Sequence, residues 1–217
     1  MRYKAVVFDL DGTLVDSAPD MRRAINGMLE ERGRRTLSLA EAVSFVGSGA
    51  RVLVQRSLRA TGGIVDEDAA LARFLELYET GVDHETVIYP CVTEMLEALQ
   101  EAGLPMALCT NKPEGPARVL CGHLNLSRFF PVIVGGDTLP VLKPDPAPLH
   151  HAIAGLGVAP EAVLYVGDSV TDYKTALAAK VDFAFVEGGY QSQAIPDFAP
   201  TYQLTRPALV GPLVLNS

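Results

Sequence analysis

The stretch that decides the fold is KAVVFDLDGTLVDSAPD, residues 4–20. Its continuous apolar run predicts a buried β-strand over residues 4–9. The strand leads directly into two carboxylates, Asp9 and Asp11, and then into Gly12, which lets the backbone turn tightly around a small ligand. Taken alone, the Asp11-Gly12 pair is equally typical of a simple turn, and Asp9 of a helix cap. Residues elsewhere in the chain are needed to distinguish a ligand site from an ordinary turn and helix cap.

Composition sets the class of protein. The chain has 217 residues, of which 48% are hydrophobic and 20% charged, enough for one large domain or a core with a smaller lobe. The net charge is 18 − 26 = −8 without a basic block, which argues against nucleic acid as a partner. The cysteines lack CxxC spacing, and no stretch resembles a signal peptide or a membrane span. We therefore expect a cytoplasmic protein with reduced thiols and no membrane association.

The second half of the chain alternates strands with helices. The predicted strands are near-continuous apolar runs, typical of a parallel sheet that helices cover on both faces. These strands are expected over residues 105–110, 131–136, 162–169 and 182–189. The N-terminal strand belongs with this set.

Between residues 16 and 86 the pattern is helical, and we see no convincing strand there. Helices are expected over residues 17–33, 39–45, 50–60 and 66–80. Ser17 and Asp20 have the spacing of a capping box at the start of the first helix. The predicted fold class is α/β: a parallel-sheet core of residues 1–15 and 87–217, with an inserted all-helical domain of residues 16–86.

Polar side chains gather where the predicted parallel strands end. Thr110 and Asn111 follow one strand, and Asp168 ends another, with Asp172 four residues later. The carboxyl ends of parallel strands meet at one edge, so these acids are expected to converge with Asp9 and Asp11. Such a cluster of carboxylates needs a cation, and hard oxygen ligands favour Mg²⁺. An ordinary N-cap would explain one acid of the Asp168–Asp172 pair but not both.

A phosphate substrate would suit a cation at this place, and it also needs donor groups. Thr110 offers a hydroxyl and a backbone N–H, and Lys143 offers an ammonium in the stretch between two strands. A lone lysine is most often a surface residue, so its position carries the argument.

Four segments together reveal a family likeness. DLDGTLVD, TNK, KP and GDSVTD resemble, in order, the four motifs of the haloacid dehalogenase (HAD) phosphohydrolase superfamily. Within it, DGTLVDSAPD, FVGSGARVLVQRSL, TNKP and KPDPAPL are similar to phosphoglycolate phosphatases. The resemblance implies a Rossmann-like core with a C1-type helical cap. It also implies a Mg²⁺-dependent phosphatase of small phosphomonoesters, with 2-phosphoglycolate as the expected substrate, acting as a monomer or homodimer.

The resemblance also assigns roles to residues. Asp9 would be the nucleophile that forms an aspartyl-phosphate, and Asp11 the general acid and then the general base. The phosphate-binding residues would be Gly12, Thr110, Asn111 and Lys143. Mg²⁺ would be held by Asp9, by Asp11 through its backbone carbonyl, and by Asp168, with Asp172 on the metal or one contact behind it.

Substrate recognition is expected from the helical insert. Gly47, Ser48 and Gly49 precede a helix and could cradle an anion, although glycines equally mark a helix–helix turn. Arg56 could meet a substrate carboxylate, the alternative being a solvated helix residue. The functional alternatives are a phosphomutase of the β-phosphoglucomutase kind and a phosphatase for another small sugar or nucleotide phosphate. Thr13 argues against the mutase.

Overall fold

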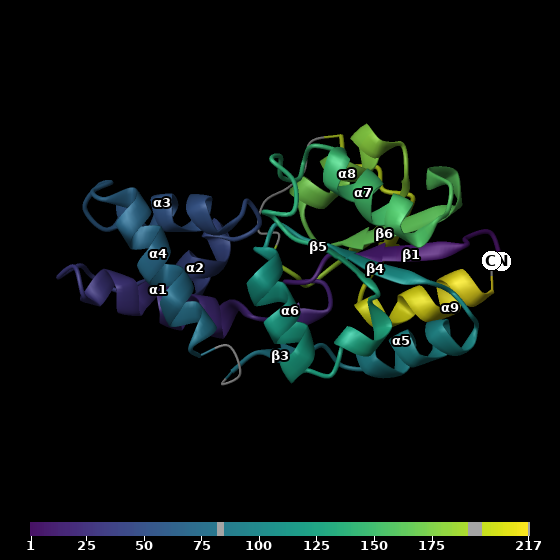
Figure 1. The fold of residues 1–217 in the computed structure, drawn as a ribbon, viewed down its shortest axis with the longest axis horizontal. Helices are drawn as coiled ribbons and strands as arrows, with labels where there is room; N and C mark the ends of the chain where they lie inside the picture. Colours follow the sequence, from purple (N-terminus) through teal and green to yellow (C-terminus); the bar gives the residue numbers. More distant parts are fainter. Residues whose placement is uncertain (82–84, 191–196, 217) are drawn as a thin grey trace.

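The computed structural model describes residues 1–81, 85–190 and 197–216. Its central sheet has six strands in the order β5-β4-β1-β6-β7-β8, and every pair is parallel (Figure 1). The strands are β1 Ala5–Phe8, β4 Met106–Cys109, β5 Val132–Val134, β6 Val163–Gly167, β7 Asp182–Val186 and β8 Tyr202–Leu204. The N-terminal strand therefore lies inside the sheet, between β4 and β6, as the Rossmann-like α/β class requires.

Both faces of the sheet are covered by helices, which explains the unbroken apolar runs of the strands. The helices are α5 Val92–Glu101, α6 Glu114–His123, α7 Ala147–Leu156, α8 Val170–Ala179 and α9 Val210–Leu215, with short 3₁₀ turns at Ser127–Phe129, Pro160–Ala162 and Pro207–Leu209. Helices α7 and α8 lie on one face, and α5, α6 and α9 on the other (Figure 1).

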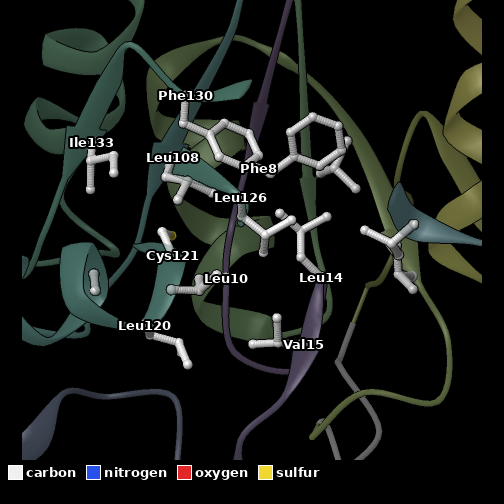
Figure 2. Close-up of a cluster of buried hydrophobic side chains, with 14 of the residues drawn as sticks. Phe8, Leu10, Leu14, Val15, Leu108, Leu120, Cys121, Leu126, Phe130 and Ile133 are labelled. Atoms are coloured by element: carbon white, nitrogen blue, oxygen red, sulfur yellow. The ribbon is translucent and has the colours of Figure 1, made fainter. Parts of the chain in front are cut away.

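Successive residues of β1 pack alternately into two separate hydrophobic clusters, one on each face of the sheet. Val6 and Phe8 pack in the cluster beneath α5, α6 and α9, whereas Ala5 and Val7 pack with α7 and α8. Figure 2 shows the first cluster, in which the rings of Phe8 and Phe130 meet edge to face with centroids 6.2 Å apart. Burial on both faces fixes the register of β1, and with it the position of the acids that follow.

The four helices of the insert lie together beside the sheet (Figure 1). They are α1 Ala18–Glu30, α2 Leu39–Phe45, α3 Ala50–Ala60 and α4 Glu67–Glu79. A complete capping box at Ser38 and Glu41 starts α2, and Gly49, with φ of 86°, starts α3. These local signals explain why the predicted bounds of α2 and α3 are correct.

The predicted capping box at Ser17 and Asp20 is wrong. The Ser17 hydroxyl donates a hydrogen bond to Asp11 instead, and its side chain does not cap α1. The Asp20 carboxylate accepts hydrogen bonds from the N–H and hydroxyl of Thr86, at 2.9 and 2.6 Å. Both side chains therefore form hydrogen bonds with residues outside α1 and do not cap its N-terminus.

The insert is joined to the sheet by a pair of short strands. Strands β2 Val15–Asp16 and β3 Val87–Ile88 pair antiparallel, one at each crossing of the chain. They are too short to show as strands in the sequence. The division at residues 16 and 86 stays a prediction, and residues 82–84, next to the second crossing, lie outside the described residues.

No helix within the described ranges could span a membrane. The longest, α1 and α4, have 13 residues each, whereas a transmembrane helix needs about 20 apolar residues.

Candidate active site

Asp9 lies at the carboxyl end of β1, near the middle of the sheet. Its backbone N–H donates to the carbonyl of Val166 at 2.8 Å, which continues the β1–β6 pairing by one residue. Its Oδ1 atom is buried and lies 3.1 Å from Lys143 Nζ. That atom accepts no well-oriented hydrogen bond from the described part of the chain, so a lone pair is left for a reaction partner.

Three buried carboxylates converge here, those of Asp9, Asp168 and Asp172. One oxygen of each lies within 4.8 Å of the others. Burial, and then the charge of Asp172, raise the pKa of Asp9 to about 7 against the opposing effect of Lys143. Burial and the same neighbouring acids raise the pKa of Asp168 well above its ordinary value. The cluster is therefore unfavourable in its ionised form unless a cation lies among the oxygens.

The donor set fits Mg²⁺, a hard cation that prefers carboxylate oxygens. The Asp168 oxygens accept from the Thr13 hydroxyl at 3.0 Å and from the Tyr190 N–H at 2.6 Å, which fixes the carboxylate but leaves lone pairs unused. Each oxygen of Asp172, in contrast, accepts two hydrogen bonds from protein groups. The residues best placed to hold the ion directly are Asp9 and Asp168.

Asp172 instead anchors Lys143. Its Oδ1 accepts from Lys143 Nζ and from the Tyr165 hydroxyl, both at 2.6 Å, and its Oδ2 accepts from Ser169 at the start of α8. Lys143 Nζ also contacts the Cys109 carbonyl at 2.9 Å. Burial alone would lower the pKa of Lys143, but the Asp172 and Asp9 charges outweigh it and raise that pKa. The ammonium is therefore a fixed charge beside Asp9.

Asp11 points away from the acidic cluster, so its carboxylate is not placed as a metal ligand. Lys112 Nζ lies 2.9 and 3.0 Å from its two oxygens, and the Ser17 hydroxyl donates to Oδ1. Lys112 was not predicted as a site residue, although its position directly after Thr110 and Asn111 is a signal that could have indicated it. The surroundings of Asp11, a lysine and a serine hydroxyl, thus differ from those of Asp9.

Asn111 holds Lys143 in place. Its Oδ1 accepts from the Lys143 N–H at 2.9 Å, and its Nδ2 donates to the Lys143 carbonyl at 3.0 Å and to the Gly47 carbonyl at 3.2 Å. The side chain thereby connects the loop of the insert with the sheet edge. Because its amide groups make these contacts, Asn111 positions the backbone of Lys143. Thr110 is buried next to it, and its hydroxyl lines the same cavity.

Position 12 requires glycine because of its backbone conformation and its close approach to Asp168. Its φ is +84°, and a Cβ at this position would lie 2.5 Å from Asp168 Oδ2. A side chain would clash with the carboxylate and strain the backbone as well. The glycine thus lets the turn after β1 pass directly against Asp168.

A cavity of about 570 Å³ opens over these residues, between the sheet edge and the insert. From the sheet side it is lined by Asp9, Asp11, Thr110, Asn111, Lys112, Lys143 and Asp168. From the insert it is lined by Gly47, Ser48, Gly49, Arg56 and Tyr78. Arg56 donates to the Phe45 carbonyl at 3.0 Å, so the loop before α3 and this guanidinium are held together. The volume suits a small molecule.

Tyr190 connects the acidic cluster to the start of the insert, and it was not predicted either. Its hydroxyl accepts from the N–H groups of Ser17 and Ala18 at 2.7 and 2.9 Å, and donates to Asp16 at 2.9 Å. The phenol oxygen thus satisfies backbone donors at the start of α1 in place of the expected capping box. Because the Tyr190 N–H also holds Asp168, one residue supports both parts of the site.

A family model described as haloacid dehalogenase-like hydrolase matches residues 6–186, most of the chain. Among curated relatives, a phosphoglycolate phosphatase of Cereibacter sphaeroides is 45% identical over 195 residues, covering 88% of this chain and 88% of the relative. Phosphoglycolate phosphatase 1 of Pseudomonas aeruginosa is 44% identical over 205 residues, covering 91% of this chain and 75% of the relative.

Solved structures agree with this similarity. The crystal structure of a predicted phosphoglycolate phosphatase from Haemophilus somnus superposes with a TM-score of 0.93 at 29% identity, covering 100% of this chain and 99% of that one. A phosphate complex of CbbY from Rhodobacter sphaeroides has a TM-score of 0.82 at 22% identity, covering 96% and 98%, and shows a shared fold.

Proposed function

Because the chain belongs to the haloacid dehalogenase-like hydrolase family, we propose that it is a Mg²⁺-dependent phosphatase that hydrolyses 2-phosphoglycolate to glycolate and phosphate. It is a phosphoric monoester hydrolase, and its relatives named phosphoglycolate phosphatase point to the substrate. We further propose that it acts in the cytoplasm, as a monomer or homodimer.

One observation carries the chemistry: Asp9 lines the cavity beside a fixed lysine charge, and its buried Oδ1 accepts no well-oriented hydrogen bond from the described part of the chain. In the proposed first step, Asp9 attacks phosphorus and the bond from phosphorus to the ester oxygen breaks, leaving an aspartyl-phosphate. Lys143 and the Thr110 hydroxyl hold the phosphoryl oxygens as charge builds on them. Asn111 supports this step by fixing the backbone of Lys143.

Asp11 serves as the proton carrier in both steps. It gives a proton to the departing glycolate oxygen, then takes one from the water that attacks the aspartyl-phosphate, releasing Asp9 and phosphate. Its separation from the acidic cluster and its contact with Lys112 support a role distinct from that of Asp9.

Asp9 and Asp168 would hold the magnesium ion, with the Asp11 backbone carbonyl and with Asp172 behind them. Bound Mg²⁺ would offset the repulsion between the Asp9 carboxylate and an anionic phosphate. The raised pKa values of Asp9 and Asp168 in the protein alone support a cation requirement.

A panel of phosphomonoesters assayed for phosphate release, with and without EDTA, tests the proposal. It should include 2-phosphoglycolate, glucose phosphates and nucleoside monophosphates, with Asp9→Asn as the control. We expect the highest kcat/KM on 2-phosphoglycolate and loss of turnover with EDTA. A sugar or nucleotide phosphate that is turned over faster would replace the substrate, and robust turnover by Asp9→Asn would remove the nucleophile.

A further inference from the structure

Lys112 and Tyr78 line the cavity, and neither has a direct contact with substrate in the reaction as described. Lys112 follows the phosphate-binding segment at the end of β4, and Tyr78 lies on α4 of the insert. Lys112 Nζ lies 4.5 Å from the centre of the Tyr78 ring, so the sheet edge and the insert meet at this contact. Both side chains line the cavity.

The Tyr78 hydroxyl is buried, and its charged neighbour is the Lys112 ammonium. The residue is 2% exposed, and its hydroxyl forms no well-oriented hydrogen bond in the described part of the chain, so its contact with Lys112 leaves it short of a good partner. A buried hydroxyl without a well-oriented hydrogen bond is unfavourable unless a further group satisfies it. Its position on a cavity wall makes a ligand atom the natural partner.

The position of Lys112 follows from its contact with Asp11. The oxygen that leaves phosphorus must lie within hydrogen-bond reach of Asp11, about 2.6–3.2 Å. In phosphoglycolate a single methylene separates that oxygen from the carboxylate group. A cation 2.9 Å from Asp11 is therefore adjacent to the carboxylate of the substrate as well.

Lys143 and Arg56, which also line the cavity, have different surroundings. Lys143 is surrounded by Asp9, Asp172, Tyr165 and the Cys109 carbonyl, and it faces the phosphoryl end. Arg56 donates to the Phe45 carbonyl and lies 3.5 Å from the Ser48 hydroxyl, on the insert. Lys112 is nine-tenths buried, so an anion reaches it only from within the cavity.

Resting on the proposed function, we propose that Lys112 and Tyr78 form the subsite for the substrate carboxylate and determine specificity for acidic two-carbon phosphomonoesters. The lysine supplies the charge, and the tyrosine hydroxyl supplies a hydrogen bond. Because Tyr78 belongs to the insert, carboxylate binding also favours the arrangement in which insert and sheet edge are in contact.

The kinetic test compares 2-phosphoglycolate with ethyl phosphate, which has a methyl group in place of the carboxylate. The readout is the selectivity ratio, kcat/KM on phosphoglycolate divided by kcat/KM on ethyl phosphate. We expect the ratio to fall about ten-fold in Tyr78→Phe and about a hundred-fold in Lys112→Met, since hydrogen bonds to charged groups contribute about 1.5–3 kcal/mol. Arg51→Met is the matched control, because Arg51 pairs with Glu67 and Asp68 outside the cavity lining.

A binding test separates this role from an effect on Asp11. 3-Phosphonopropionate places a methylene where phosphoglycolate has its bridging oxygen, so it binds without needing a proton, and propylphosphonate lacks its carboxylate. We expect both variants to lose affinity for 3-phosphonopropionate while their affinity for propylphosphonate falls much less.

Three outcomes are decisive. Equal losses on both substrates and on both phosphonates would overturn the subsite and make Lys112 a positioning residue for Asp11. A wild-type enzyme that does not prefer phosphoglycolate over ethyl phosphate would overturn the proposed function itself. If Lys112→Met does not fold, Tyr78→Phe decides alone, because it keeps the ring that lies over the ammonium.

Discussion

Removing a single oxygen, in Tyr190→Phe, should weaken both the link to the insert and the metal site. The phenol oxygen satisfies the N–H groups of Ser17 and Ala18 and donates to Asp16. Without it, Ala18 keeps its 3.2 Å contact with Asp16, but the Ser17 N–H, in a fully buried residue, loses its partner. One unpaired buried donor and one lost hydrogen bond to a carboxylate together cost about 2–3 kcal/mol.

For a chain of this length, about 2–3 kcal/mol corresponds to a fall in melting temperature of about 4–12 °C. Differential scanning calorimetry of the metal-free protein measures it. The backbone N–H of Tyr190 holds Asp168, so loosening this segment should also weaken Mg²⁺ binding about ten-fold, measured by titration calorimetry.

The matched control is Tyr202→Phe. The Tyr202 hydroxyl contacts Tyr3 at 3.2 Å and Arg2 at 3.3 Å, at the end of the sheet opposite Asp9. This variant should leave Mg²⁺ affinity at the wild-type value. If Tyr190→Phe melts within about 1 °C of wild type and binds Mg²⁺ equally well, the phenol does not support the site as argued.

Four further predictions have defined outcomes. Asp9→Asn should retain the fold by circular dichroism and lose at least about 10³-fold in kcat, since an amide cannot attack phosphorus. In EDTA the Asp9 pKa of about 7 lies above the ordinary carboxyl value, so the stability that Asp9 contributes is full below about pH 4 and is lost as pH rises through 7. Melting curves from pH 4 to 8 should show this fall, Asp9→Asn should reduce it, and saturating Mg²⁺ should flatten it. Asp172→Ala should destabilise the protein by about 3–5 kcal/mol, because Lys143 is left buried without its 2.6 Å partner; a melting temperature equal to wild type would contradict this account. Gly12→Ala should cost about 1–3 kcal/mol and weaken Mg²⁺ binding, because its Cβ would press on Asp168; unchanged Mg²⁺ affinity would speak against the close packing of that turn.

Much of the fold could be predicted because its signals are local. Continuous apolar strands define the parallel sheet, and the capping residues Ser38 and Gly49 define the bounds of α2 and α3. The short strands β2, β3 and β8 have two or three residues each, too few to show a period. Their pairing depends on neighbours distant in the chain, which a single sequence does not show.

The site was predictable where a side chain belongs to a motif. Asp9, Asp168 and Asp172 lie together with Lys143 beside them, whereas the Asp11 carboxylate, expected in the same cluster, pairs with Lys112 instead; the roles of these residues stay predictions. Lys112 and Tyr190 were missed because their importance comes from contacts made across the fold, with Asp11 and with the start of α1. The same cause explains Ser17, whose capping preference yields to a hydrogen bond with Asp11.

The paired strands β2 and β3 bear on protein engineering. Because the outgoing and returning chain are hydrogen-bonded to each other, the two crossings behave as one two-stranded ribbon and not as two independent tethers. A chimaera that borrows the insert of a relative should therefore take the whole segment from Val15 to Ile88, including both halves of the ribbon. Grafts cut inside it would join mismatched strand partners at the junction between the insert and the sheet.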